Sequence, residues 1–521
     1  EGEGEGVSGL RDAILLSADR YFPLTLAILT ESGSETHQVL EEAMLGEIVT
    51  ESLSLPSSET ESLSHANLCP ALASLLCMRQ ICILARENAP RLLVAGALAP
   101  LGALMMPGSN HRMEVRCLSA RVASAMFNTS PQALNDILGL ENMRETAVFA
   151  AASAMAMLQS LYPGITVPPA DQTLSDLYHR CAASVSSLVY LSASGIGVAD
   201  KLCSPVGAKV LSDIVHHPCA SSRAVANAML ALCGLYLTNP DQRVTSAIAR
   251  EPFNKNQVPA GALKAMRRFR ETHLAEISAA KESGLDMEEG DDWRVQFAGL
   301  LLSYQALQTV PHIGRSFVVN GIIPAASSAI NAFPDVYVVV EMAMRVLAAS
   351  TDRIVMSHDA IAEDGTVIPT TEKPIMMVYK HAAAAVRAVC ARMKAFFDMA
   401  ANPSQGKVPR IAPVLLNGAT VAVLCLLHAG GTCNQQDKLC KVAVESGIAP
   451  ILARTVSGIQ QQNKDEGMEG DEMRRLTVPG SMGHLLQMLM SHPFSRDAMV
   501  KQLAKVGINI NPTQRGMVTK K

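Results

Sequence analysis

The chain of 521 residues is 49% hydrophobic, 4% aromatic and 18% charged, and its formal net charge is −4. A negative net charge argues against a protein whose main task is to coat nucleic acid, because such proteins carry excess positive charge. Apolar residues that are mostly Ala, Leu, Val and Met, with so few aromatics, favour helices packed on helices. We therefore expect an all-α fold.

The 12 cysteines are scattered, many of them inside apolar helical runs, as at Cys82, Cys233 and Cys390. This usage is typical of buried thiols that stay reduced. It predicts an intracellular reducing compartment, with the cytoplasm first, including the cilium or cytoskeleton, and an organelle as the alternative. Because the sequence starts at Glu1 rather than Met, a removed targeting peptide stays an open alternative.

Residues 1–63 are expected to form a partly helical N-terminal extension, and a helical pattern continues from there to residue 510, before a tail at 511–521. Helices in the first half are predicted at Ala66–Arg86, Met113–Phe127, Thr146–Leu161, Leu174–Ser192 and Arg223–Leu237. Residues 239–292 then break the pattern, with a basic segment followed by an acidic run. We interpret them as an inserted helix and a solvated loop.

The clearest helical unit spans Val318–Ser350. Counted from Val336, apolar residues fall at offsets 0, 3, 4, 7, 10 and 11, which is one face of a helix. Two further insertions are expected near residues 359–373 and 460–475. Later helices are predicted at Pro374–Ala400, Pro413–His428, Leu439–Val456, Met482–Met490 and Arg496–Val506.

A short sequence motif occurs three times in the chain. In each copy a helix-like run stops at Gly and resumes near Pro: Gly96 and Pro100, Gly321 and Pro324, Gly447 and Pro450. The last two glycines are 447 − 321 = 126 residues apart, which is three times 42. A period near 42 residues is typical of stacked helical repeats, each of which is a small group of helices.

The chain resembles the armadillo-repeat family over residues 64–510. The resemblance rests on these glycines and prolines and on the long predicted helices at 115–127, 223–237 and 336–349. The HEAT repeat is the near alternative. The resemblance implies a right-handed superhelical α-solenoid of armadillo-like repeats with loop insertions. It also implies that the third helix of each repeat lines a concave groove that binds extended peptides or other proteins.

The nuclear-import members of that family clamp a basic peptide with Trp and Asn four residues apart on the third helix. This chain departs from the pattern, because its single Trp is Trp293. Four residues before Asn128, Asn227 and Asn417 stand Ser124, Arg223 and Pro413. The resemblance therefore implies a general scaffold and does not imply an import receptor.

Polar stripes on the predicted third helices are the candidate partner-binding residues. Their spacings of three, four, seven or eight residues place each stripe on one helix face: Arg121 with Asn128, Arg223 with Asn227, and Tyr337 with Glu341 and Arg345. If these helices line a groove, the stripes would bind a partner. The alternative is that they are ordinary polar faces in contact with water.

A second candidate is the basic patch, defined as Lys264, Arg267, Arg268 and Arg270. Cations gathered on one helix attract acidic proteins or RNA. The alternative is a solvated helix whose charge is offset by the acidic run at 286–292.

Three stretches of roughly membrane-span length lack Asp, Glu, Lys and Arg: Leu92–His111, Cys181–Ala199 and Ile411–Gln436. Each contains helix breakers or polar residues, so we expect buried solenoid helices rather than membrane spans.

The sequence has no Gly-x-x-x-x-Gly-Lys phosphate loop, no Gly-x-Gly-x-x-Gly that follows a predicted strand, no Gly-x-Ser-x-Gly elbow and no His-Glu-x-x-His. Cys433 and Cys440 have six residues between them rather than the two to four of a zinc site, and the run from His216 to Cys219 lacks a second pair of ligands at zinc spacing. We therefore predict no catalytic residues, no cofactor, no metal and no small-molecule substrate. The predicted function is a non-catalytic scaffold that binds other proteins, as a structural subunit of a ciliary, cytoskeletal or organellar assembly. The alternatives are a helical enzyme or enzyme-regulatory subunit with an unrecognised site, and a membrane-associated helical protein.

Overall fold

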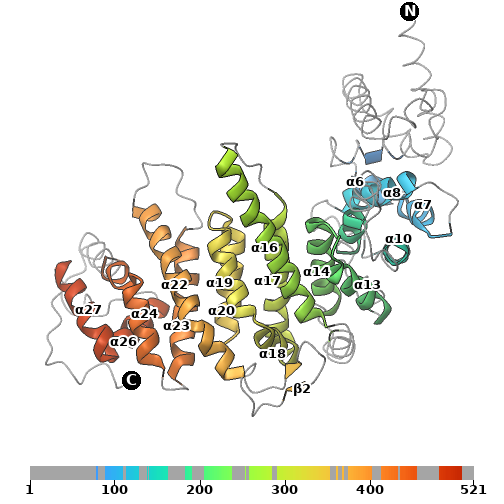
Figure 1. Cartoon of the computed structure of the whole chain (residues 1–521). Helices are drawn as coiled ribbons and strands as arrows, with labels where there is room; N and C mark the ends of the chain where they lie inside the picture. The colour runs from blue at the N-terminus through green and yellow to red at the C-terminus, as the bar shows by residue number, and fades with distance from the viewer. Residues whose placement is uncertain are drawn as a thin grey trace, which may run out of the picture. The chain divides into compact units, whose positions relative to one another are not determined.

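The computed structural model describes scattered positions between Leu75 and Cys82 and then, with gaps, residues 89–127, 138–161, 182–190, 203–237, 253–283, 290–351, 360–401, 412–454 and 480–506 (Figure 1). Most of these residues are helical, so the predicted all-α class is confirmed. The predicted extension 1–63, the insertion 460–475 and the tail 511–521 lie outside the described residues. The chain divides into two compact units, 1–265 and 266–521.

The first unit contains a core of small and medium apolar side chains. Its helices are α6 (Ala89–Val94), α7 (Leu98–Met105), α8 (Met113–Phe127), α10 (Glu141–Leu161), a helical segment at 182–190, α13 (Pro205–His216) and α14 (Ser222–Tyr236). Helix α10 packs on α7 and α13, and α13 packs on α14. Ala147, Ala150, Ala154 and Met157 of α10 are fully buried. The helix predicted at Thr146–Leu161 therefore lies within α10, which buries one Ala- and Met-rich face.

The second unit begins inside α16 (Val258–Ser283), the helix that contains the boundary between the units. Its other helices are α17 (Asp292–Thr309), α18 (Pro311–Asn320), α19 (Ile322–Ala332), α20 (Tyr337–Ala349), α22 (Pro374–Ala401), α23 (Ala412–Gly431), α24 (Gln436–Glu445), a helical segment at 448–454, α26 (Gly480–Ser491) and α27 (Pro493–Lys505). The predicted helix 439–456 is thus broken near Gly447.

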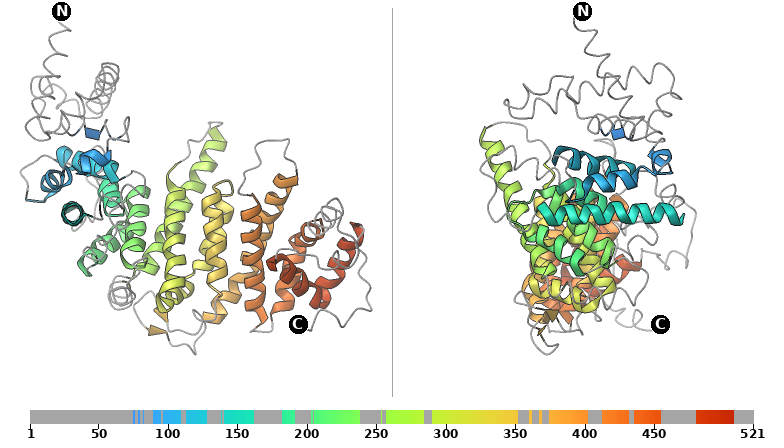
Figure 2. Two further views of the ribbon diagram at one scale, coloured as in Figure 1. Left: turned by 180° about the vertical axis from the view of Figure 1, so that it is seen from behind. Right: turned by 90° about the vertical axis from the view of Figure 1, so that its right-hand side faces the viewer.

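Helices of the second unit pack in two lines. In one line α17 contacts α20, α20 contacts α23, and α23 contacts α26. In the other line α19 contacts α22, α22 contacts α24, and α24 contacts α27. The left view of Figure 2 shows these helices side by side. Each line therefore joins helices that are not neighbours in the sequence.

The three repeated glycines have the same backbone conformation. Gly96, Gly321 and Gly447 have φ angles of +80°, +102° and +87°, a region that residues with a side chain rarely adopt. Each sits between two short helices, and in each case its N–H donates to the carbonyl three residues earlier. The repeated motif in the sequence is therefore a repeated left-handed turn, which ends one helix and changes the direction of the chain before the next.

Two of the predicted insertions differ from expectation. Residues 359–373 were expected to be a polar insert, and they contain a small antiparallel hairpin of β1 (Ala360–Ile361) and β2 (Val367–Ile368), with β1 against α18. Residues 239–292 contain α16, whose first half is a core helix, since Val258, Ala262 and Met266 are fully buried. Apolar side chains at helical spacing bury the first half, and only the second half is the solvated helix predicted.

Candidate functional site

Polar side chains of α8 and α14 bond to the helical segment 182–190 in the first unit. The hydroxyl of Ser124 on α8 donates a 2.8 Å hydrogen bond to the carbonyl of Ser184 in the helix at 182–190. From the other side, the amide of Asn227 on α14 donates to the carbonyl of Ala183 at 3.2 Å and to the hydroxyl of Ser187 at 2.7 Å. One helix thus receives hydrogen bonds from both of its neighbours.

A similar link occurs in the second unit. The hydroxyl of Ser481 on α26 donates to the side-chain oxygen of Asn417 on α23 at 2.8 Å. Asn227 and Asn417 are therefore both bonded to a neighbouring helix. An amide nitrogen has two hydrogens, and both hydrogens of Asn227 have an acceptor within the protein. This arrangement gives Asn227 a role in packing, and its predicted part in partner binding stays a prediction.

The other candidates in the first unit lie on the same helices. Arg223 is exposed near the start of α14, and Arg121 is half-buried on α8. Asn128 follows the end of α8 and lies outside the described residues. Arg223 therefore remains the most accessible member of the predicted stripes in this unit.

The stripe on α20 forms a connected set of side chains. Arg345 Nη2 lies 2.6 Å from Glu341 Oε1, one turn away, and their side chains are 51% and 23% exposed. The Tyr337 ring packs edge-on against Phe396 of α22, with ring centroids 6.3 Å apart. The predicted spacing therefore does bring Glu341 and Arg345 together on an accessible face. The ring of Tyr337, in contrast, packs against Phe396, whose own ring is buried in the core.

The basic patch lies along α16. Lys264 and Arg267 are exposed, whereas Arg268 and Arg270 are half-buried. The Arg268 guanidinium lies over the ring of Phe269, 4.4 Å from its centroid. Burial lowers the pKa of Arg270, Glu271 opposes this shift, and the positive charge of Arg267 adds to it. At Arg270, therefore, burial is the largest effect, and the neighbouring carboxylate of Glu271 outweighs the repulsion from Arg267.

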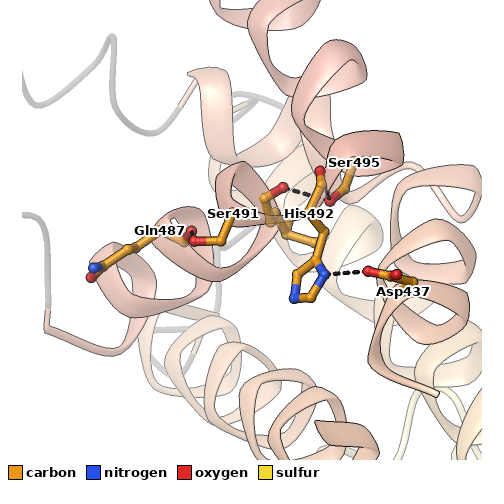
Figure 3. Close-up of polar contacts among 6 residues, drawn as sticks. Asp437, Gln487, Ser491, His492 and Ser495 are labelled. Atoms are coloured by element: carbon orange, nitrogen blue, oxygen red, sulfur yellow. Dashed lines mark hydrogen bonds and ion pairs between the residues drawn. The ribbon is translucent and has the colours of Figure 1, made fainter. Parts of the chain in front are cut away.

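A polar cluster in the C-terminal helices was not predicted from the sequence (Figure 3). His492, which precedes α27, contacts Asp437 of α24 through its Nδ1 nitrogen. Next to it Lys441 lies 5.8 Å from the ring centre of Phe494, a residue that is 70% exposed. Asp437 and His492 are 55 residues apart and share no motif, so only the packing of α24 on α27 brings them together.

A carboxylate and a histidine in contact resemble two members of a hydrolase triad, and a serine is close by in Figure 3. The hydroxyl of Ser495, however, is buried and donates to the backbone carbonyls of Leu489 and His492. A hydroxyl held by backbone carbonyls on the first turn of a helix is not placed for transfer of its proton to His492. The contact between His492 and Asp437 instead holds the start of α27 against α24.

Within the described residues, no group of three or more His, Cys, Asp or Glu side chains is arranged to hold a metal ion. Burial raises the pKa of the Cys233 and Cys390 thiols to about 12, so these thiols are poor nucleophiles and poor metal ligands.

Among the residues that the structure describes, no single helix has the length and hydropathy to cross a membrane. The consecutive helices α18 and α19, which meet at 66°, pass that test only when taken together.

Comparison with known proteins adds no assignment. The sequence matches no family model. It also has no significant match to a curated protein. The functional proposal therefore depends on the residues and on the arrangement of the helices.

Proposed function

We propose that this chain is a non-catalytic, protein-binding scaffold of armadillo-like repeats that forms a structural subunit of a large multiprotein assembly. The observation that carries the proposal is the line of contacts α17–α20–α23–α26 in the second unit. In an armadillo solenoid, successive third helices pack on one another and together present one continuous surface to a partner.

The repeated turns support the same assignment. In the best described unit, α18 ends at Gly321, α19 follows it, and α20 comes third. Gly96 stands in the same position between α6 and α7, before the long α8. Gly447 likewise follows α24. Three copies of one turn, each before a packed helix, are what a repeat architecture requires.

The accessible face of α20 is the proposed binding surface for which the structure gives most detail. Glu341 and Arg345 hold each other in a fixed geometry on that face. An exposed ion pair of this kind contributes little to stability, about 0.3–0.5 kcal/mol. Substitutions there therefore test binding without unfolding the chain.

The first test is affinity purification of the tagged full-length protein at mild salt, followed by size-exclusion chromatography and mass spectrometry. We expect co-elution at high mass with a fixed set of proteins. A soluble monomer that retains no partner from its own cells would contradict the structural-subunit proposal.

The second test exchanges the charges of the α20 pair with the double variant Glu341→Arg and Arg345→Glu. This variant keeps an ion pair within the helix but reverses the pattern seen by a partner. A matched control is Lys209→Asp with Asp213→Lys on α13, which exchanges an exposed pair at the same spacing. We expect loss of partners only for the α20 exchange. Equal recovery of partners by both variants would exclude this face.

A further inference from the structure

Helix α8 of the first unit contains a buried arginine. Only 8% of the surface of Arg116 is exposed, and its neighbours Val115, Cys117 and Leu118 are buried apolar residues. A guanidinium group keeps its positive charge inside a protein. Because charges act more strongly where water is excluded, a cation in this position is costly unless an anion lies beside it.

The contacts of Arg116 supply no such anion. Its Nη2 atom donates to the backbone carbonyl of Met105, the last residue of α7, over 3.4 Å, which is long for a hydrogen bond. Its Nε atom is buried and has no partner. Among the described residues, the ion pairs join other side chains. The guanidinium is therefore buried against one weak acceptor and no carboxylate.

The tip of the Arg116 side chain is still reachable from solvent. Two of its nitrogens, Nε and Nη1, have no hydrogen-bond partner, and only Nε is enclosed. The small exposed part of the residue therefore includes the tip of the guanidinium at Nη1. So narrow an opening suits one oxygen-bearing group and does not suit a broad surface.

The position of Arg116 on its helix favours the same kind of ligand. Arg116 is the fourth residue of α8, which begins at Met113. The N–H groups of a first helical turn have no acceptor within the helix, and they give that end a partial positive charge. Side chains on a helix lean toward its N-terminus. The buried guanidinium and the start of α8 therefore contribute positive potential to one place.

We propose that Arg116 and the first turn of α8 bind an oxyanion, either a phosphate group or the carboxylate of an acidic side chain. Arginine pairs with the oxygens of both groups through its N–H bonds. The anion accepts from Nη1 and from the second hydrogen of Nη2, and it balances the buried charge. This site goes beyond the proposed scaffold function and does not depend on it.

The test is thermal unfolding of the full-length protein in a chloride buffer, with sodium phosphate, acetate or further chloride added at matched ionic strength. We expect an oxyanion to raise the unfolding temperature by about 2–4 °C more than chloride does, with saturation. A response to phosphate alone identifies a phosphate group as the ligand, and a response to acetate as well identifies a carboxylate. The general stabilisation by phosphate salts does not saturate and is common to all variants.

Three variants assign the response to Arg116. Arg116→Met removes the charge from a buried side chain, so it should lose the saturable response and be no less stable than the unmodified chain in chloride. Arg116→Lys keeps the charge without the planar fork and should bind about tenfold more weakly. Arg223→Met removes an exposed cation of α14 in the same unit and is the matched control. Equal responses by all four proteins would overturn the proposal.

A further variant tests whether the chain itself supplies the anion. Glu114 belongs to the same first turn of α8. If the site takes an external anion, Glu114→Gln should leave the saturable response in place. A response that is seen only in this variant would mean that Glu114 already balances Arg116, and the proposal would be wrong. A large loss of stability in Arg116→Met in chloride would lead to the same conclusion, because removal of one partner exposes an existing buried pair.

Discussion

The side chain of Asn227 donates a 2.7 Å hydrogen bond to the hydroxyl of Ser187, and its second amide hydrogen goes to the carbonyl of Ala183. Both acceptors lie in the helical segment 182–190, which precedes α13 and is 40 and 44 residues earlier in the chain. In the armadillo family an asparagine on the third helix is available to a bound peptide. Here the same residue type links two helices of the first unit, and this changes what its substitution should do.

Replacement of Asn227 by Asp should destabilise the first unit by about 1–3 kcal/mol, because a carboxylate cannot donate to the carbonyl of Ala183 and would lie against that oxygen, even though the hydroxyl of Ser187 can turn to donate to it. The change is nearly isosteric, so lost packing does not explain the effect. We would measure it by hydrogen exchange of residues 182–190. Arg223→Ala, one turn away and exposed, should change exchange little. Equal protection in both variants would remove the proposed packing role.

Gly321→Ala should destabilise the second unit by about 1–3 kcal/mol, because the φ of +102° is unfavourable for a side chain, although the added methyl would lie 3.6 Å from the Pro324 ring, an ordinary contact. At Gly290 in the same unit the space is open and φ is not positive, so Gly290→Ala should be neutral or slightly stabilising. Chemical denaturation of the two variants measures the difference. Similar midpoints would mean that the turn carries no conformational requirement.

Gly261→Ala should introduce a steric clash between two helices. A methyl group at this position would lie 2.3 Å from the Cε1 atom of His216. His216 cannot swing away freely, since its Nδ1 lies 2.8 Å from the carbonyl of Ser212. Adding His216→Ala should recover much of the lost stability, which a double-mutant cycle detects as strong non-additivity.

Gly314→Ala provides the contrast to this pair. Its methyl group would lie 2.7 Å from the Cα of Leu307, and a backbone atom cannot be removed by substitution. We therefore expect a loss of stability that Leu307→Ala does not repair. If that second change restores stability, the contact is limited by the side chain and not by the backbone.

The stacking of His273 on Phe333 should make the second half of α16 sensitive to pH. Burial lowers the pKa of His273 below its usual 6.5, against the opposing effects of Glu276 and the Ala332 backbone. Between the folded pKa and 6.5 the unfolded chain binds more protons, so stability rises with pH and is complete above that range. Hydrogen exchange of α16 should accelerate as pH falls through the window, after correction for intrinsic exchange.

His273→Gln should abolish that pH dependence at α16. Burial also lowers the pKa of His381, with Lys380 adding to the shift, so His381→Gln is the matched control. Because His381 lies on α22, its replacement should leave the response of α16 unchanged. Loss of the response in both variants would assign it to a general loosening of the unit.

Native alkylation should divide the cysteines into two classes. Cys233 and Cys390 are buried and their pKa is raised to about 12, so at about pH 8 they contain almost no thiolate. Cys203, Cys219 and Cys425 are partly exposed and should react first with iodoacetamide. Mass spectrometry after short exposure gives the order. Rapid native modification of Cys390 would contradict the packing around it.

The sequence alone determined the helical class and the positions of the turns. A run such as Val336–Leu347 has apolar residues at helical spacing, and the glycines at 96, 321 and 447 stand where helices stop. Helical periodicity and left-handed turns depend on a few neighbouring residues, so they can be read locally. For the same reason the spacing of Glu341 and Arg345 correctly predicted two side chains that meet.

Only the tertiary structure decided which surfaces are free and which polar groups are already bonded. The sequence could not distinguish Asn227, whose amide is bonded within the protein, from Arg223 one turn away, which is exposed. It could not find His492 beside Asp437, or show that α16 is core in its first half and exposed in its second. These properties depend on which distant helix packs on which face, and that is decided by burial and contact over the whole unit rather than by local spacing.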